Sequence, residues 1–517
     1  MNKRILPADT AALMASDGLF AVFDVRERGE YNQAQIPNAT SLPRSQIEFR
    51  ISDLVPNRRV PIVVYDEGGS RVGLAATTLN SLGYLDVAVL QGGLGAWQSD
   101  GHETVSGVNV PSKAFGERVH HDRNVPDMSA EELKALLDSK SDLTILDVRT
   151  PEEYGRFCIP GGINVPGGEL ILWAEELRKK PAVIVNCAGR TRSIIGTAAL
   201  RRLGLTNVRA LRNGTMGWVL AGYELESKPS RHVAAPAITS GAIASAMQIA
   251  ADEKVARTGA EELVGIIEGH AGGVNYIIDV RSEPEFAAGH IPSAINVPGG
   301  QAVQRADDFV PVRNGRIIFV SNQSARAVMA AYWYRQMGFK HVSVLQGGLS
   351  EWKESQRSLV AGATLARPLS LESVKRNVSM IDATELASLS REGASILDVG
   401  SSLDYETAHV PGAKWVSRGW IDIKFAELIQ DRARRIVLTC ADGQHSIFAA
   451  RQLEEVGFGD VQVLDGGVRR WIAAGFEAAA GLEDCLVQPN DVVLSPSIRG
   501  SKQDMLNYLN WELKLKH

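Results

Sequence analysis

The sequence predicts an α/β protein built from four copies of one domain, and three observations carry this prediction. A DVR-type tetrad begins at Asp24, Asp147, Asp279 and Asp398. A glycine-containing turn ends in tryptophan at Trp97, Trp218, Trp352 and Trp471. Short apolar runs alternate with helix-like runs, which is typical of a mainly parallel sheet with helices on both faces.

The repeat keeps one register along the chain. The tetrads are 123, 132 and 119 residues apart, so the repeated unit is a domain and not a solenoid repeat. Counting back 31 residues from each tryptophan gives Asp66, Cys187, Ser321 and Cys440. An apolar, strand-like run precedes each of these four positions, so they are equivalent.

These landmarks predict five segments. We expect domains over 1–110, 120–230, 255–360 and 375–482, followed by a tail over 483–517. Linkers are expected at about 101–127, 224–258 and 359–380. The second linker, whose residues 234–251 read as a linker running into a helix, is expected to divide the chain into two halves of two domains each. In the tail, apolar residues at helical spacing predict a helix over 503–515 that docks on a domain surface.

The second domain shows the expected order of elements most clearly. Strands are predicted over 143–148, 182–186 and 208–211, and helices over 151–157, 169–179, 193–203 and 216–221. Functional sites of parallel sheets lie at the carboxyl ends of strands, where loops meet helix N-termini. Cys187 is therefore expected at such an edge.

Composition narrows the classes of function. A net charge of -5 and 22% charged residues give no basic surplus for nucleic acid. The four cysteines, at 158, 187, 440 and 485, form neither a disulfide framework nor a CxxC pattern, so we expect no metal, no cofactor and a reducing compartment. The N-terminal residues lack the apolar core of a signal peptide, and no membrane span is expected, which together predict a cytoplasmic protein.

The loop CAGRTR, residues 187–192, is the leading candidate site. Its backbone N–H groups, the following helix N-terminus and two arginines all favour a thiolate at Cys187. Cys187 is therefore the expected nucleophile. The expected substrate-binding residues are Ala188, Gly189, Arg190, Thr191 and Arg192.

Four signatures together resemble the rhodanese, or sulfurtransferase, family over nearly the whole chain. They are DVRTPEEY at 147–154, IPG at 159–161, the cysteine loop, and NGTMGW at 213–218. The resemblance implies four tandem rhodanese-like domains in which a loop cysteine carries sulfane sulfur as a persulfide. It also implies a small-molecule donor, such as thiosulfate or 3-mercaptopyruvate, and cyanide or a thiol as acceptor. The arrangement is similar to tandem rhodaneses whose first domain is inactive.

The expected chemistry follows from the charges of the loop. The Cys187 thiolate attacks the outer sulfur of thiosulfate, sulfite leaves, and a persulfide remains. Arg190 and Arg192 would draw in and orient the dianion, so thiosulfate is favoured over 3-mercaptopyruvate.

The other three loops read DEGGSR, SNQSAR and CADGQH. Asp66 has no sulfur, and Ser321 has no histidine in its loop to act as a base, so the first and third domains are expected to be structural. Cys440 and His445 form a candidate second site. It is disfavoured because Asp442 opposes a thiolate and an ordinary histidine is mostly neutral at pH 7.

Two other classes of function compete with sulfur transfer. A non-catalytic scaffold or sulfur-carrier protein would fit a chain in which two domains have lost the sulfur. A phosphatase of the Cdc25 type would carry arginine six positions after its cysteine. Here the sixth position is Ser193 and the arginine stands at the fifth, Arg192, which disfavours the phosphatase.

Other marked residues have structural interpretations. Asp147 and Arg149 are expected to form a cap or ion pair, and Trp218 and its counterparts to pack inside their domains. Cys158 is expected to be a peripheral loop residue. The alternative is a thiol that resolves the Cys187 persulfide.

Overall fold

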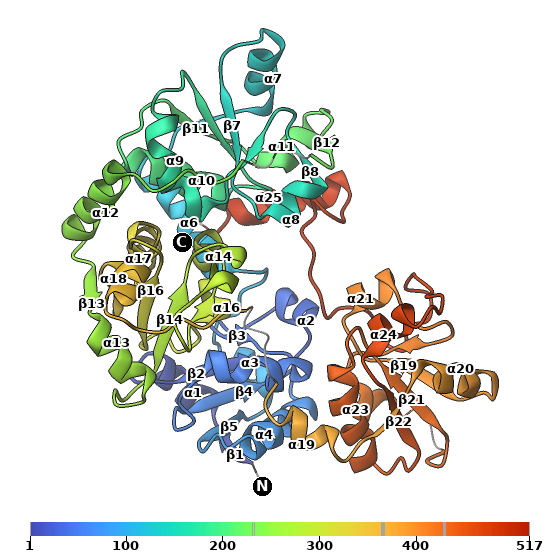
Figure 1. Cartoon of the computed structure of the whole chain (residues 1–517). Coiled ribbons are helices and arrows are strands. Elements are labelled where there is room, and N and C mark those ends of the chain that lie inside the picture. Colours follow the sequence, from blue (N-terminus) through green and yellow to red (C-terminus); the bar gives the residue numbers. More distant parts are fainter. Residues whose placement is uncertain are drawn as a thin grey trace. The chain divides into compact units, whose positions relative to one another are not determined.

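A computed structural model describes residues 2–229, 231, 233–362, 368–425, 427 and 431–515. It contains four α/β domains, each built on a five-stranded parallel sheet flanked by helices (Figure 1). The sheet orders are β1-β5-β4-β2-β3, β6-β11-β10-β7-β9, β13-β17-β16-β14-β15 and β18-β22-β21-β19-β20. The topology is therefore the same in all four domains, and the predicted fold class is confirmed. None of the described helices is long and apolar enough to span a bilayer.

The first domain begins at residue 3. Its strands are β1 (Lys3–Ile5), β2 (Ala21–Asp24), β3 (Thr40–Ser41), β4 (Ile62–Tyr65) and β5 (Val87–Leu90). Its helices are α1 (Pro7–Met14), α2 (Arg28–Gln33), α3 (Ile47–Leu54), α4 (Arg71–Ser81) and α5 (Gly93–Ser99).

The second domain adds a two-stranded antiparallel ribbon, β8 with β12, to the common sheet. Its strands are β6 (Asp127–Met128), β7 (Thr144–Asp147), β8 (Phe157–Cys158), β9 (Ile163–Asn164), β10 (Val183–Asn186), β11 (Val208–Leu211) and β12 (Glu226–Ser227). Its helices are α6 (Val110–Asp122), α7 (Ala130–Asp138), α8 (Pro151–Arg156), α9 (Leu170–Leu177), α10 (Thr191–Arg202) and α11 (Gly214–Leu220). Every strand and helix predicted for this domain is confirmed, with bounds that differ by at most two residues.

The third domain follows the same plan. Its strands are β13 (Ala256–Thr258), β14 (Asn275–Asp279), β15 (Ile295–Asn296), β16 (Arg316–Val320) and β17 (Val342–Leu345). Its helices are α12 (Ser240–Asp252), α13 (Ala260–Ile267), α14 (Glu283–Ala288), α15 (Gly299–Gln304), α16 (Ala306–Phe309), α17 (Ala325–Gln336) and α18 (Gly348–Glu354).

The fourth domain is followed by a separate C-terminal helix, α25 (Lys502–Leu513). The strands of this domain are β18 (Ser379–Ile381), β19 (Ser395–Asp398), β20 (Lys414–Trp415), β21 (Ile436–Thr439) and β22 (Val461–Leu464). Its helices are α19 (Leu371–Lys375), α20 (Ala383–Arg391), α21 (Ser402–Thr407), α23 (Gln444–Glu455) and α24 (Gly467–Ala473).

The expected linker at 101–127 is wrong over most of its length, because α6 occupies Val110–Asp122. A proline within its first two positions favours the helix start, and Val110, Phe115 and Val119 are buried. The helix packs against α10 of the second domain. It therefore belongs to the neighbourhood of the cysteine loop.

The prediction that the linker at 224–258 divides the chain into two halves of two consecutive domains is also wrong. The chain forms two compact units, and the first domain joins the fourth while the second joins the third. Helix α12, which confirms the helix expected within 234–251, packs on both α9 of the second domain and α17 of the third. This segment therefore joins two domains instead of separating two halves.

Each unit pairs its domains through the segment that follows β3, β9, β15 or β20. In the second–third unit this segment reads PGG twice, and a Cβ on Gly168 would lie 2.8 Å from the Gly299 Cα. In the first–fourth unit the same segments supply Arg44 and Arg418. An Arg44 Nη donates to Asp422 at 2.6 Å, and an Arg418 Nη donates to Glu48 at 2.6 Å. Glycine allows close backbone contact in one unit, and reciprocal ion pairs join the other.

The four landmark tryptophans are core residues, as predicted. Each indole N–H donates to the backbone carbonyl six residues later, at 2.8 to 3.1 Å. All four side chains are buried. The recurring tryptophan therefore closes the last helix of each domain against the chain that leaves it.

Replacing Arg418 by Met should destabilise the first–fourth unit by about 3 kcal/mol, because Glu48 would keep a buried charge without its partner. A urea titration followed by tryptophan fluorescence measures this. The double variant Arg418→Met, Glu48→Leu should recover most of the loss. Lys3→Met, which breaks the exposed pair with Asp86, is the control and should cost less than about 1 kcal/mol. Equal effects of the Arg418 and Lys3 variants would contradict this account.

Candidate active site

The cysteine loop lies where the sequence predicts it, between the carboxyl end of β10 and the start of α10. Its position is fixed by the tryptophan turn. The Thr215 N–H donates to the Cys187 carbonyl at 2.8 Å. A Cβ on Gly214, whose φ is +54°, would lie 2.1 Å from that carbonyl oxygen, so only glycine allows this approach. Equivalent N–H groups of Leu94, Leu349 and Val468 bind the loop carbonyls of the other domains at 2.8 to 3.0 Å.

The equivalent loop of the first domain binds its own first side chain through backbone N–H groups. One carboxylate oxygen of Asp66 accepts the Gly68 and Gly69 N–H groups at 2.7 and 2.9 Å. The other accepts the Val72 N–H at 3.0 Å. The side chain is fully buried. The loop is thus a cradle of backbone N–H groups that holds a negative charge on its first side chain.

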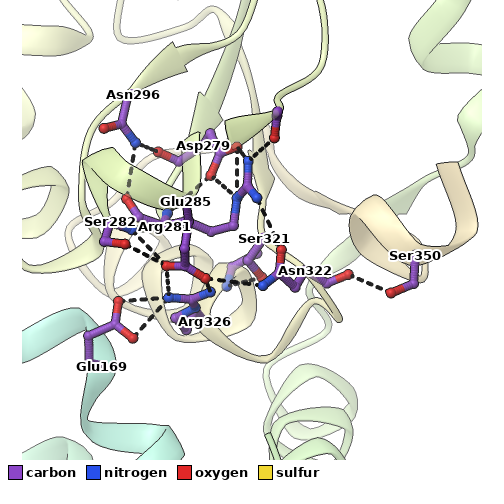
Figure 2. A network of polar contacts seen from close by, with 12 residues as sticks. Glu169, Asp279, Arg281, Ser282, Glu285, Asn296, Ser321, Asn322, Arg326 and Ser350 are labelled. Atoms are coloured by element: carbon purple, nitrogen blue, oxygen red, sulfur yellow. Dashed lines mark hydrogen bonds and ion pairs between the residues drawn. The ribbon is translucent and has the colours of Figure 1, made fainter. Parts of the chain in front are cut away.

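The third domain fills the cradle with a hydroxyl group. The Ala327 N–H donates to the Ser321 Oγ at 3.2 Å. Figure 2 shows the polar network beside it, in which Arg326 bonds both Glu285 of its own domain and Glu169 of the second domain at 2.6 to 2.9 Å. Although burial opposes it, Arg326 holds the pKa of Glu285 at about 2. The arginine of this loop is neutralised by carboxylates, and the loop carries no thiol.

Cys187 places sulfur at the equivalent position of the second domain, where Ser193 is its hydrogen-bond partner. The side chain is 2% exposed, and its thiol faces the Ser193 Oγ at 3.6 Å. Burial raises the pKa of the Cys187 thiol, while Arg192 and Ser193 oppose the rise and Glu512 adds to it. Arg192 and Ser193 thus favour the thiolate, as expected from the sequence, while burial of the sulfur opposes them.

Both loop arginines are held by carboxylates. Arg190 bonds Glu117 of α6 at 2.6 and 2.8 Å, and Arg192 bonds Glu153 of α8 at 2.5 and 2.8 Å. Although burial opposes it, Arg192 lowers the pKa of Glu153 to about 2. The arginines thus bring fixed positive groups to the loop, but each has an anionic partner beside it.

The tail helix α25 confirms the predicted helix and docks on the second domain, directly at the loop (Figure 1). The Thr191 Oγ1 donates to Glu512 Oε1 at 2.5 Å, and the Thr191 N–H reaches the same oxygen at 3.4 Å. A Cβ on Gly189 would lie 3.3 Å from Glu512 Oε2. A Cβ at Gly189 would therefore lie in tight contact with the side chains of Met216 and Glu512 beneath the helix.

Three residues at the loop were not predicted from the sequence: Lys113 and Glu117 on α6, and Glu512 on α25. The Lys113 Nζ lies 4.6 and 4.7 Å from the ring centres of Tyr508 and Trp511. A proline followed by a buried apolar face could have identified α6 as a helix. The sequence carries no signal for the docking partner of either helix, because both lie outside the repeated landmarks.

The second candidate thiol, Cys440, sits in an unfavourable environment for a thiolate. Burial, with Asp398 and Asp442 nearby, raises the pKa of Cys440 to about 11. Asp398 lacks the arginine found in the other three tetrads, where Gly400 now stands, and burial raises its pKa to about 7. Burial and Arg418 lower the pKa of His445 to about 3. The predicted opposition by Asp442 and the neutral state of His445 are both confirmed.

The DVR tetrad of the second domain and Cys158 both have surroundings that indicate structural roles. Asp147 and Arg149 form a buried ion pair with bonds of 2.7 to 3.1 Å, as predicted. Cys158 is not a loop residue, since it lies buried in β8, which pairs with β12. Burial and Glu226 raise the pKa of Cys158 to about 11. This thiol is poorly suited to resolve a persulfide.

Replacing Asp66 by Asn should loosen the loop of the first domain, because an amide nitrogen would face backbone N–H donors. We expect a loss of about 2 kcal/mol in local stability. Hydrogen–deuterium exchange of the amides of residues 67–72 measures it. Asp100→Asn, at an exposed position, is the control and should leave exchange unchanged. Unaltered protection in the Asp66 variant would show that the N–H cradle does not depend on the charge.

Comparison with known proteins agrees with this geometry. The model of the rhodanese-like domain matches residues 7–100, 129–221, 260–355 and 382–474. The crystal structure of a thiosulfate sulfurtransferase from Pseudomonas aeruginosa is 39% identical, with a TM-score of 0.92 over 99% of this chain and 97% of that one.

Single-domain relatives match shorter stretches. A sulfurtransferase of Allochromatium vinosum is 29% identical over 20% of this chain and 94% of its own length. The thiosulfate sulfurtransferase GlpE of Pseudoalteromonas translucida is 31% identical over 19% of this chain and 90% of its own. The domain matches cover more than half of the sequence, in the same four places where the structure has its sheets. The chain therefore belongs to the rhodanese family and carries four rhodanese-like domains.

Proposed function

We propose that this protein is a sulfurtransferase that carries sulfane sulfur as a persulfide on Cys187, with thiosulfate as the donor. The N–H cradle is the observation that carries the proposal. Asp66, at the equivalent position of the first domain, accepts three backbone N–H groups, which supports a loop that can stabilise an anion on its first side chain. A persulfide on Cys187 is such an anion, and the loop around it has the same register. The family and the sulfurtransferase relatives support the general activity.

The reaction balances through two displacements. Cys187 loses its proton to solvent, and its sulfur attacks the outer sulfur of thiosulfate. A new S–S bond forms, the original S–S bond breaks, and its electron pair leaves with sulfite. Cyanide or a thiolate then attacks the terminal sulfur and regenerates the Cys187 thiolate. Backbone N–H groups of the loop stabilise the sulfur anion in both steps.

The other domains are assigned supporting roles. The cradles of the first and third domains hold oxygen groups, Asp66 and Ser321, which cannot carry sulfane sulfur. Cys440 remains a thiol beside two carboxyl groups. We propose that it does not turn over, and that the protein works in the cytoplasm, where its four free cysteines stay reduced.

Thiosulfate treatment should add one sulfur atom to the wild-type protein, on Cys187. Peptide mass spectrometry locates the addition of about 32 Da, and cyanide should then release thiocyanate. Cys187→Ser should reduce thiocyanate formation by at least about 1,000-fold. Cys440→Ser is the matched control and should retain the wild-type rate. Absence of thiocyanate with several donors would favour the scaffold, and hydrolysis of a generic phosphomonoester would favour the phosphatase.

Persulfide formation should accelerate with pH, because the buried Cys187 thiol must lose its proton before it attacks. The pKa of this thiol is raised, so the reactive fraction grows about tenfold per pH unit between pH 6 and 8. Single-turnover release of sulfite measures the rate. A plateau below pH 7 would contradict a raised pKa in the reacting state.

A further inference from the structure

Helix α25 is held over the Cys187 loop by both apolar and charged contacts. Met505 and Leu509 pack with Met216 of α11 in a small buried cluster. Tyr508 and Trp511 lie against Lys113 of α6. Burial, Glu512 and Cys187 all raise the pKa of Tyr508, which places its hydroxyl in the neighbourhood of both groups. The helix thus covers the loop, and Cys187 is 2% exposed beneath it.

Glu512 is the residue of α25 that enters the loop. Its side chain is almost fully buried, and Oε1 takes both the hydroxyl and the N–H of Thr191. In the part of the chain that the structure describes, Oε2 has no hydrogen-bond donor. A buried carboxylate oxygen without a donor is costly. The contact therefore stores free energy that would be recovered if Glu512 moved into water.

The charges around the loop do not favour an anionic donor while Glu512 is in place. Arg190 is paired with Glu117, and Arg192 with Glu153. Glu512 adds a further carboxylate without a cationic partner among the hydrogen bonds and ion pairs described. A dianion such as thiosulfate would meet this negative charge at the Thr191 donors. Departure of Glu512 would remove the charge and free those donors together.

The chain leading to α25 suits a movable helix. Residues 486–500 form neither helix nor strand. The helix then starts at its own capping box, in which Ser501 and Asp504 bond each other's backbone N–H groups. An isolated helix of 12 residues is marginally stable in water, so α25 would lose helical structure when it leaves the loop, and its cap therefore contributes to the docked state.

We propose that α25 is a gate on the Cys187 site and that Glu512 determines donor entry by occupying the Thr191 donors. When the helix moves away, an anionic donor group replaces the Glu512 carboxylate and Cys187 becomes accessible. The inference about donors depends on the proposed sulfurtransferase function, whereas the gating itself does not.

Alkylation of the full-length protein by iodoacetamide tests the gate independently of turnover. The reagent is small and uncharged, and mass spectrometry reads its rate at Cys187 separately from the other cysteines. Glu512→Ala removes the side chain that covers Thr191 and Gly189, and it should accelerate alkylation of Cys187 at least tenfold and increase the rate of sulfite release from thiosulfate. Asn510→Ala, on an exposed position of the same helix, is the matched control and should react as the wild type does.

A second variant acts at a distance from the loop. Ser501→Ala removes the N-cap of α25 and should accelerate Cys187 alkylation about fivefold without altering any contact of Glu512. Wild-type alkylation rates in both Glu512→Ala and Ser501→Ala would overturn the gate. Faster alkylation without persulfide formation from thiosulfate would support the gate and reject the proposed donor.

Discussion

The structure of every domain depends on one contact, the hydrogen bond between the first loop carbonyl and the N–H that follows the glycine of the tryptophan turn. This bond fixes the loop at the end of the central strand, and glycine is required because a Cβ would collide with the carbonyl. The first side chain of each loop then lies at the start of the following helix, where the residue six positions later supplies a hydrogen bond. A carboxylate, two thiols and a hydroxyl occupy the same place in the four domains. The chemistry of each domain is decided by one residue in a common backbone.

Two of the three carboxylates around the Cys187 loop come from helices outside the repeated core. The helix α6 supplies Glu117 to Arg190, and α25 supplies Glu512 to Thr191, while Glu153 comes from α8. Burial raises the pKa of the Cys187 thiol and is the largest effect on it, so the nearby cation alone does not produce a thiolate. Reactivity therefore depends on access to the loop as much as on the residues of the loop.

Much of the fold could be predicted from the sequence, since the repeats set the register and the apolar runs set the strands. Strand β11 agrees with its prediction at both ends. Domain pairing could not be predicted from linker composition, although PGG in the second and third domains, with Arg44 and Arg418 in the others, marks the true partners. Glu117 and Glu512 were missed because docking of α6 and α25 is tertiary. No local pattern encodes which surface a helix will cover.

Because the first domain pairs with the fourth and the second with the third, the domains assemble in a fixed order during synthesis. The second and third domains are neighbours in the sequence, and they can meet as soon as both have left the ribosome. The first domain must wait for the fourth, which at roughly 5–20 residues per second arrives tens of seconds later. During that interval the surface around Arg44 and Glu48 faces solvent or chaperones. This waiting surface combines the charges of Arg44 and Glu48 with the ring of Phe49, which packs on Phe448 once the fourth domain arrives.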